Sequence, residues 1–255
     1  MSCCPVTALP AVQGAAAIVG ATKQFKSTLL FVAQPATPTK VGILALPDIF
    51  GLDSGRTKTD AEALAQLGYA VAVVDLTSGD YMELEKMSEF GSWLAKNTFE
   101  DVLSVHLQEA IEFLQSEFKV ESIVSYGYCW GGYVGARQSA LRNSIIKGNV
   151  SFHPSWGVEN MINGEGAVEK LTERITVPQL LLAAGDDPAF VRENGSVIKI
   201  LWDKPETSAH SQVIDFPDMN HGWVNRGDVE KPEVKAGVAK AWHTALKFIQ
   251  TVAPQ

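Results

Sequence analysis

Cysteine is scarce in this chain of 255 residues, which contains only Cys3, Cys4 and Cys129. Three cysteines cannot form a fully paired disulfide framework, and such frameworks persist mainly in oxidising compartments. Cys3 and Cys4 are neighbours near the N-terminus, so we interpret them as exposed thiols, with S-acylation or metal capture as the alternative. The cysteine content favours a reducing, cytoplasmic location.

Long apolar runs and basic charge are also lacking. No run approaches the ~18 apolar residues that a membrane-spanning helix requires. No lysine or arginine precedes Lys23, so the basic leader of a secretory signal peptide is missing. The 21 Lys and Arg against 29 Asp and Glu give a net charge of −8. Nucleic acids and anionic membranes both select a basic surface, so we expect neither as a partner.

The sequence has no internal repeat, no linker rich in Pro, Gly and Ser, and no glycine-rich nucleotide fingerprint. The five histidines are scattered, without the spacing of a metal site. We therefore expect no metal and no cofactor. A length of 255 residues suits one domain over residues 1–255, in which residues 1–25 form a peripheral N-terminal segment. A monomer and a homodimer are both compatible with these features.

What the sequence does contain is an alternation of apolar β-rich runs with longer helical patterns. This alternation predicts an α/β fold: a mostly parallel, doubly wound sheet of about seven to eight strands flanked by helices. The predicted strands are Thr28–Gln34, Val41–Leu46, Ala70–Asp75, Ser122–Tyr126, Gly148–His153, Gln179–Ala184 and Ser211–Phe216. The predicted helices are Asp60–Leu67, Glu83–Lys96, Phe99–Glu117, Tyr133–Arg142, Val168–Arg174, Ala189–Leu201 and Val234–Thr251.

The most informative motif is Gly127-Tyr128-Cys129-Trp130-Gly131-Gly132, which lies between a predicted strand and a predicted helix. Strand, sharp turn and helix are the setting of a nucleophile elbow, in which glycines let the central side chain project alone. The helix directs its partially positive N-terminus at that side chain, which favours a thiolate. The alternative is a buried cysteine that packs as a small apolar residue.

Two further polar groups follow predicted strands. Asp186 and Asp187 come after Gln179–Ala184, and His221 comes soon after Ser211–Phe216. Nucleophile, acid and histidine is the chain order of an α/β-hydrolase triad. A thiol needs an imidazole to take its proton, and an acid fixes the tautomer of that imidazole. We favour Asp187 as the acid, with Asp186 as the alternative.

Four segments together resemble the dienelactone hydrolase (carboxymethylenebutenolidase) family, a branch of the α/β hydrolases. They are Leu46-Pro47-Asp48-Ile49-Phe50-Gly51, Gly127-Tyr128-Cys129-Trp130-Gly131-Gly132, Gly185-Asp186-Asp187 and Asn220-His221-Gly222-Trp223. The resemblance runs from about Val41 to about Ile249. It implies a Cys129, Asp187, His221 triad and an oxyanion hole built from the backbone amides of Ile49 and Trp130.

The resemblance also bears on Asp48, which occupies a position where the family often has a thiol-contacting glutamate. Asp48 is therefore a thiol-interacting candidate, with a local turn residue as the alternative. Phe50, Tyr81, Trp223 and Arg226 are candidate substrate-binding residues. His153, which ends a predicted strand, is interpreted as a supporting residue.

Together these features predict a carboxylic ester hydrolase that cleaves a small-molecule ester or lactone through an acyl-cysteine intermediate. Family members specialised for dienelactone grip its carboxylate with paired arginines, and this chain has no arginine between Arg56 and Arg137. We therefore expect a neutral substrate. Two alternatives remain: a binding or regulatory protein that retains the fold with little or no activity, and a glycosidase, which needs two carboxyl groups about 5–9.5 Å apart.

Overall fold

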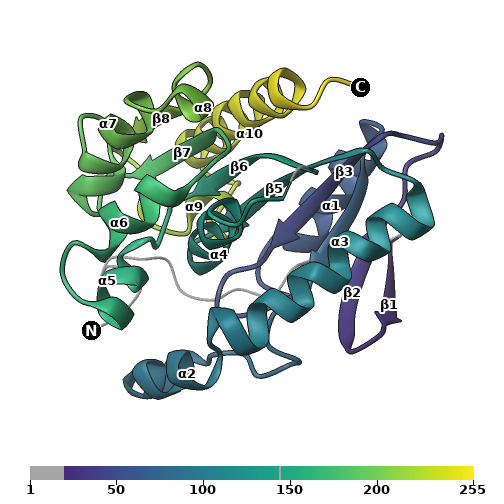
Figure 1. Cartoon of the computed structure of the whole chain (residues 1–255), viewed down its shortest axis with the longest axis horizontal. Coiled ribbons are helices and arrows are strands. Elements are labelled where there is room, and N and C mark those ends of the chain that lie inside the picture. Colours follow the sequence, from purple (N-terminus) through teal and green to yellow (C-terminus); the bar gives the residue numbers. More distant parts are fainter. Residues whose placement is uncertain (1–19, 144) are drawn as a thin grey trace.

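The protein is described by a computed structural model that covers residues 20–143 and 145–255. These residues form a single α/β domain around an eight-stranded sheet of order β1-β2-β4-β3-β5-β6-β7-β8 (Figure 1). The strands are β1 Ala21–Phe25, β2 Thr28–Ala33, β3 Val41–Leu46, β4 Ala70–Val74, β5 Ser122–Tyr128, β6 Ile146–Phe152, β7 Gln179–Ala184 and β8 Gln212–Phe216.

The sheet is parallel from β4 through to β8, and only β1 and β2 run antiparallel to their neighbours. Helices cover both faces, as the apolar strands require. The longer helices are α1 Thr57–Gln66, α2 Phe90–Lys96, α3 Ser104–Phe118, α4 Trp130–Ser139, α5 Gly157–Asn163, α6 Ala167–Arg174, α7 Ser196–Trp202 and α10 Pro232–Val252. The short ones are η1 Leu84–Glu89, η2 Phe99–Leu103, η3 Ala189–Val191, α8 Pro205–Ser208 and α9 Trp223–Arg226.

Alternation along the strands divides the core into two layers. In β3, Leu44 and Leu46 pack in the layer that contains α3, α4, α6 and α7. Ile43 and Ala45 point to the opposite layer, against α1 and α10. Figure 1 shows α3 and α4 in front of the sheet and α1 and α10 behind it. Because successive side chains of a strand face opposite ways, every central strand must be apolar almost throughout.

The predicted fold class is confirmed, and most predicted elements are present. β3 and β7 have the predicted bounds, whereas β5 continues to Tyr128, so the strand ends immediately before Cys129. The sequence pattern did not reveal β1, α5, α8 or α9. Of the predicted N-terminal segment, residues 21–25 form the edge strand β1, and Cys3 and Cys4 lie outside the described residues.

Parallel strands place their carboxyl ends along one edge of the sheet, where ligands bind in open α/β folds. The segments that follow β3, β5, β6, β7 and β8 carry Asp48, Cys129, His153, Asp187 and His221. In the described ranges, no helix is long and apolar enough to cross a membrane. Residues 20–143 and 145–255 likewise contain no group of three or more His, Cys, Asp or Glu arranged to hold a metal ion.

Candidate active site

Cys129 lies in a strained turn between β5 and α4. Its backbone has φ 55° and ψ −116°, an unusual conformation for a residue with a side chain. A Cβ at Gly127 would lie 2.2 Å from the carbonyl carbon of Gly131, and a Cβ at Gly131 would lie 2.2 Å from the oxygen of Leu46. Only glycine permits these approaches, so the two glycines let α4 start directly above the sheet. This is the geometry of a nucleophile elbow.

Asp187 and His221 form a short buried contact, with 2.6 Å between His221 Nδ1 and Asp187 Oδ1. The other carboxylate oxygen of Asp187 accepts a hydrogen bond from the Ala184 amide at 2.7 Å. Burial raises the pKa of Asp187, and the adjacent His221 opposes that rise. Asp186 does something different: its Oδ1 accepts the backbone N–H of His221 at 2.7 Å. One acid therefore holds the imidazole and the other holds the loop that carries it.

Ser155 contacts both the cysteine and the histidine. Its Oγ is 3.2 Å from Cys129 Sγ and 3.5 Å from His221 Nε2. The Ser155 side chain is buried, and its amide donates to the Cys129 carbonyl at 3.1 Å. Ser155 is not among the residues predicted from the sequence. Its position three residues after β6, the neighbour of β5, is the signal that could have identified it.

His153 is a second buried histidine beside His221. The two rings meet edge to face with 4.9 Å between centroids, and His153 also stacks on Tyr128 at 5.9 Å. Neither ring nitrogen of His153 has a hydrogen-bond partner among the described residues. Burial, followed by the proximity of His221, lowers the pKa of His153 well below its ordinary value. His153 is therefore a neutral ring, and its φ of 39° is a further strained position at this edge of the sheet.

Asp48 follows β3 and is buried among donors. Its carboxylate accepts from the Phe50 amide at 3.0 Å, from Ser54 Oγ at 2.8 Å and from Asn225 Nδ2 at 2.8 Å, and it forms an ion pair with Arg226. Asp48 and Arg226 were both predicted to lie in the site, but their pairing was not predicted. The Arg226 guanidinium is buried and points toward the Asp48 carboxylate.

The two candidate oxyanion donors lie at the ends of neighbouring elements. The first N–H groups of a helix have no intrahelical acceptor, so the Trp130 amide at the start of α4 is available. In the described part of the chain, the Ile49 amide has no acceptor, whereas the Ile49 carbonyl accepts from the Met82 amide at 2.9 Å. The contact of Gly131 with Leu46 and Pro47 keeps the two segments together.

The candidate substrate-binding aromatic residues have different surroundings. Trp223 is buried, lies edge to face with His153 and has no partner for its Nε1 among the described residues. Phe50 is partly buried, and the Arg226 guanidinium lies over its ring at 5.3 Å. Tyr81 packs against Gly51, where a Cβ would lie 2.5 Å from its ring. Burial, and next to it the charge of Asp75, raises the pKa of Tyr81.

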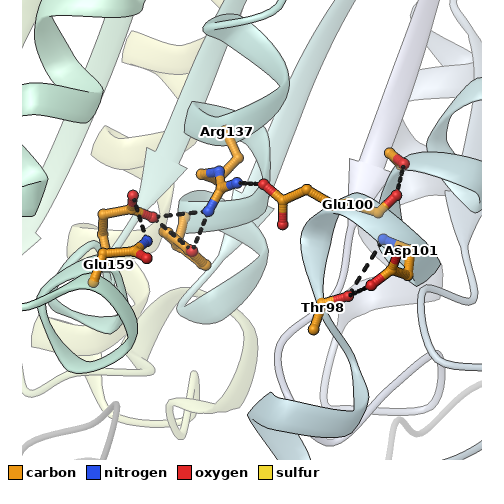
Figure 2. Close-up of polar contacts among 8 residues, drawn as sticks. Thr98, Glu100, Asp101, Arg137 and Glu159 are labelled. Carbon is orange, nitrogen blue, oxygen red and sulfur yellow. Dashed lines mark hydrogen bonds and ion pairs between the residues drawn. The ribbon is translucent and has the colours of Figure 1, made fainter.

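A separate ion-pair cluster, in which Arg137 and Glu159 are buried and Glu100 is exposed, lies at the opposite end of α4 (Figure 2). Arg137 Nη1 lies 3.1 Å from Glu159 on α5, and its Nη2 pairs with Glu100 on η2. Tyr133 donates its hydroxyl proton to Glu159 at 2.8 Å, and the guanidinium lies over the Phe99 ring at 4.6 Å. This cluster ties α4, α5 and η2 together.

A strand-to-helix elbow above a mostly parallel sheet, with an acid and a histidine on later strand ends, defines the class as an α/β hydrolase. The family model described as the dienelactone hydrolase family matches residues 30–253. The chain belongs to that family. This confirms the resemblance seen in the sequence.

Similar proteins agree with this assignment. The chain is 26% identical to "Hydrolase tropI" of Talaromyces stipitatus, over 84% of this chain and 82% of that protein. It is 24% identical to the carboxymethylenebutenolidase homolog of Xenopus tropicalis, over 90% and 89%. Among solved structures, a putative dienelactone hydrolase from Klebsiella pneumoniae superposes with a TM-score of 0.67 at 17% identity, over 92% of this chain and 100% of that one.

Proposed function

We propose that this member of the dienelactone hydrolase family hydrolyses a carboxylic ester or lactone through an acyl-cysteine intermediate. Cys129 is the nucleophile, His221 the general base and acid, and Asp187 the group that orients His221. The observation that carries the proposal is the 2.6 Å contact of His221 with Asp187, on the same sheet edge as a cysteine in a strained elbow. A small molecule is the class of substrate that the family implies.

In the acylation step, the thiolate of Cys129 attacks the ester carbonyl, forming a C–S bond and moving the carbonyl electron pair onto oxygen. The amides of Ile49 and Trp130 donate to that oxyanion, which is the form of stabilisation that acyl transfer most needs. The tetrahedral intermediate then collapses: the C–O bond to the alcohol breaks, and imidazolium His221 gives its proton to the departing oxygen.

In the deacylation step, water replaces the alcohol. Neutral His221 takes a proton from water while the water oxygen attacks the thioester carbonyl. The amides of Ile49 and Trp130 donate to the second oxyanion, as they did to the first. Collapse breaks the C–S bond and returns the proton to sulfur, which releases the carboxylic acid. This cycle uses water and three side chains, and needs no further reagent.

The division of work between the two aspartates supports Asp187 as the orienting acid. Its Oδ1 contacts the ring Nδ1 of His221, which fixes the proton on that nitrogen and leaves Nε2 able to accept one. The contact of Asp186 with the His221 backbone supports a different role, in holding the loop.

The contacts of Asp48 support the turn interpretation of this residue. Four donors, one of them the Arg226 guanidinium, converge on its carboxylate, and they join the turn after β3 to α9. Through that turn, Asp48 would hold the Ile49 amide in place. A contact of Asp48 with the thiol would be additional to this role.

The state of the arginines supports a neutral substrate. Arg226 pairs with Asp48, and Arg56 donates to the carbonyl oxygens of Trp223, Val224 and Gly227. A guanidinium engaged in this way is poorly placed to grip a carboxylate bidentately. Phe50, Tyr81 and Trp223 would then bind an apolar acyl or alcohol group.

One relative gives a specific reason to test a sugar substrate. The chain is 29% identical to a maize "Endo-1,3;1,4-beta-D-glucanase" over 49% of its length. A glycosidase would need two carboxyl groups on opposite sides of the scissile bond. Asp48 and Asp187 are instead held by protein donors, which favours the esterase.

The test is a screen of aryl esters, lactones, thioesters and a mixed-linkage glucan, with mass spectrometry of the protein quenched during turnover. The proposal expects ester or lactone hydrolysis and an acyl adduct on the Cys129 peptide. Glucan cleavage that survives in Cys129→Ala would overturn it in favour of the glycosidase. Absence of turnover on every substrate, with no adduct, would favour a binding or regulatory protein.

A further inference from the structure

The Ser155 hydroxyl lies close to both groups that exchange a proton in the proposed reaction. It lies 3.2 Å from Cys129 Sγ and 3.5 Å from His221 Nε2, so it contacts both reacting atoms. Hydrogen bonds in a site without substrate are often long and tighten as the reaction proceeds. The amide of Ser155 donates to the Cys129 carbonyl at 3.1 Å, so the nucleophile and this hydroxyl are held on a common backbone frame.

The direction of these hydrogen bonds follows from Asp187. An ionised carboxylate only accepts, so the proton of neutral His221 is on Nδ1, 2.6 Å from Asp187 Oδ1. Nε2 therefore carries a lone pair, and Ser155 must be the donor in its contact with Nε2. The lone pairs of Ser155 Oγ then face the thiol, which donates its S–H. One consistent chain results, from thiol to hydroxyl to imidazole.

We infer that Ser155 is a catalytic residue that relays the proton of the Cys129 thiol to His221. As the S–H bond breaks and its proton bonds to Ser155 Oγ, the original O–H bond of Ser155 breaks and that proton bonds to Nε2. Ser155 ends as it began, a neutral hydroxyl, while the pair becomes thiolate and imidazolium. This inference rests on the proposed function, in which Cys129 is the nucleophile.

The surroundings favour the product of this transfer. After the relay, the Ser155 hydroxyl donates to the new thiolate, which also lies at the N-terminus of α4, where negative charge is stabilised. Asp187 stabilises the new imidazolium from the other side. Burial of Ser155 keeps bulk water from taking its place in the chain.

The test compares Ser155→Ala with Ser155→Thr, which keeps a hydroxyl, and with the matched control Ser151→Ala. Ser151 is equally buried and lies on β6, but its Oγ contacts the Gly132 carbonyl and Trp156 rather than the triad. Thermal unfolding first establishes that each variant is folded. The rate of iodoacetamide alkylation at the Cys129 peptide is then measured against pH by mass spectrometry.

Ser155→Ala should slow alkylation of Cys129 near neutral pH and move the midpoint of its pH profile upward, while Ser151→Ala leaves the profile in place. The pre-steady-state acylation rate with an aryl ester should fall by about 10²-fold, the lower range for loss of a proton-transfer group, with KM little changed. Ser155→Thr should recover the rate to within about tenfold of the parent. In mixtures of light and heavy water, the parent should show the curved dependence of two transferred protons and Ser155→Ala a linear one.

A parent-like alkylation profile and acylation rate in folded Ser155→Ala would overturn the relay. That outcome is separate from failure of the proposed function, because alkylation measures thiolate formation without any ester. A parent protein that alkylates normally at Cys129 but forms no acyl adduct would instead overturn the proposed function.

Discussion

The two ends of α4 differ in whether the buried polar groups beside them have hydrogen-bond partners. At the C-terminal end, Arg137 satisfies its charge with Glu159 and Glu100, and Tyr133 donates to the same carboxylate (Figure 2). At the N-terminal end, Cys129 is strained, and both nitrogens of His153 lack a partner among the described residues.

The contrast distinguishes the paired groups around Arg137 from the unpaired groups at the end of α4 where we propose that catalysis takes place. Buried polar groups are normally hydrogen-bonded, so orphaned ones in a native fold call for an explanation. Within residues 20–143 and 145–255, the indole N–H groups of Trp130 at the start of α4 and of Trp223 at the start of α9 also lack a partner. The two orphaned nitrogens of His153 lie beside His221, on the same edge of the sheet as the proposed nucleophile Cys129. We expect substitutions at one end to change activity and substitutions at the other to change stability.

The largest effect is expected for Cys129→Ala. Removal of a nucleophile costs between about 10³- and 10⁶-fold in kcat, because the remaining oxyanion donors and binding contacts give only residual catalysis. The thermal unfolding midpoint should stay close to that of the parent, since a small buried group is lost. Steady-state kinetics with the best ester from the screen provide the measurement. Parent-like turnover in Cys129→Ala would show that Cys129 is not the nucleophile and that the reaction takes place elsewhere.

Next comes Asp187→Asn, for which we expect a fall in kcat of about 10⁴-fold, since an amide stabilises the wrong tautomer of His221. Asp186→Asn is the matched control and should stay within about tenfold, because its contact is with the backbone amide of His221. Both variants are compared by kcat at the pH optimum. If Asp186→Asn proves the more damaging, the orienting acid has been assigned to the wrong residue.

At the other end of α4, Arg137→Met should lower the free energy of unfolding by about 3–5 kcal/mol, because Glu159 is left buried and uncompensated. The double variant Arg137→Met with Glu159→Leu should recover much of that loss. Lys86→Met breaks an exposed pair with Glu83 and should cost at most ~1 kcal/mol. Urea unfolding measures all three. A large loss of kcat/KM in folded Arg137→Met would show that the two ends of α4 are not independent.

A smaller effect concerns substrate charge. With Arg226 paired to Asp48, a carboxylate-bearing lactone should be a poorer substrate than its methyl ester. A missing charge-assisted contact is worth about 1.5–3 kcal/mol, or roughly 10- to 150-fold in kcat/KM. The two lactones are compared directly. A preference for the free acid that disappears in Arg226→Ala would reveal an anion clamp at the reactive end.

The last effect is on pH-dependent stability. Burial raises the pKa of Asp60 from 3.8 to about 7, against the opposing influence of Tyr128 and Arg56. Between those values the folded protein holds a proton that the unfolded chain has released, so the contribution of Asp60 to stability is greatest in acid and is lost as pH rises through this window. Asp60→Asn should flatten urea-unfolding stability over the same range. An unchanged slope would mean that Asp60 titrates normally.

Sequence periodicity predicted the central strands well, because strands covered on both faces are continuously apolar. It failed for β1, whose residues are mostly exposed at the sheet edge. It also joined η3 to α7, although Asn194 at φ 65° and the close approach of Gly195 to the Phe190 oxygen break the helix there. Short elements such as α9 depend on tertiary contacts and carry too few residues for a period.

Within the candidate site, the order of Cys129, Asp187 and His221 could be read from the chain, because each follows a strand. The pairing of Asp48 with Arg226 joins residues 178 positions apart. Ser155 and His153 gain their significance only where β5, β6 and β8 place their ends together. Such contacts depend on sheet order, which local patterns do not specify.

The glycine frame of the elbow has a consequence for how this protein can change. A side chain at Gly127 or Gly131 meets main-chain atoms, which cannot rotate away as a side chain would. The substitution Cys129→Ser, by contrast, replaces one side-chain atom and requires no change in the main chain. The backbone of the elbow is therefore compatible with Cys129→Ser, whereas Gly127 and Gly131 accept no side chain unless the main chain shifts. The packing of the elbow thus constrains its backbone conformation more strictly than the identity of the side-chain atom at Cys129.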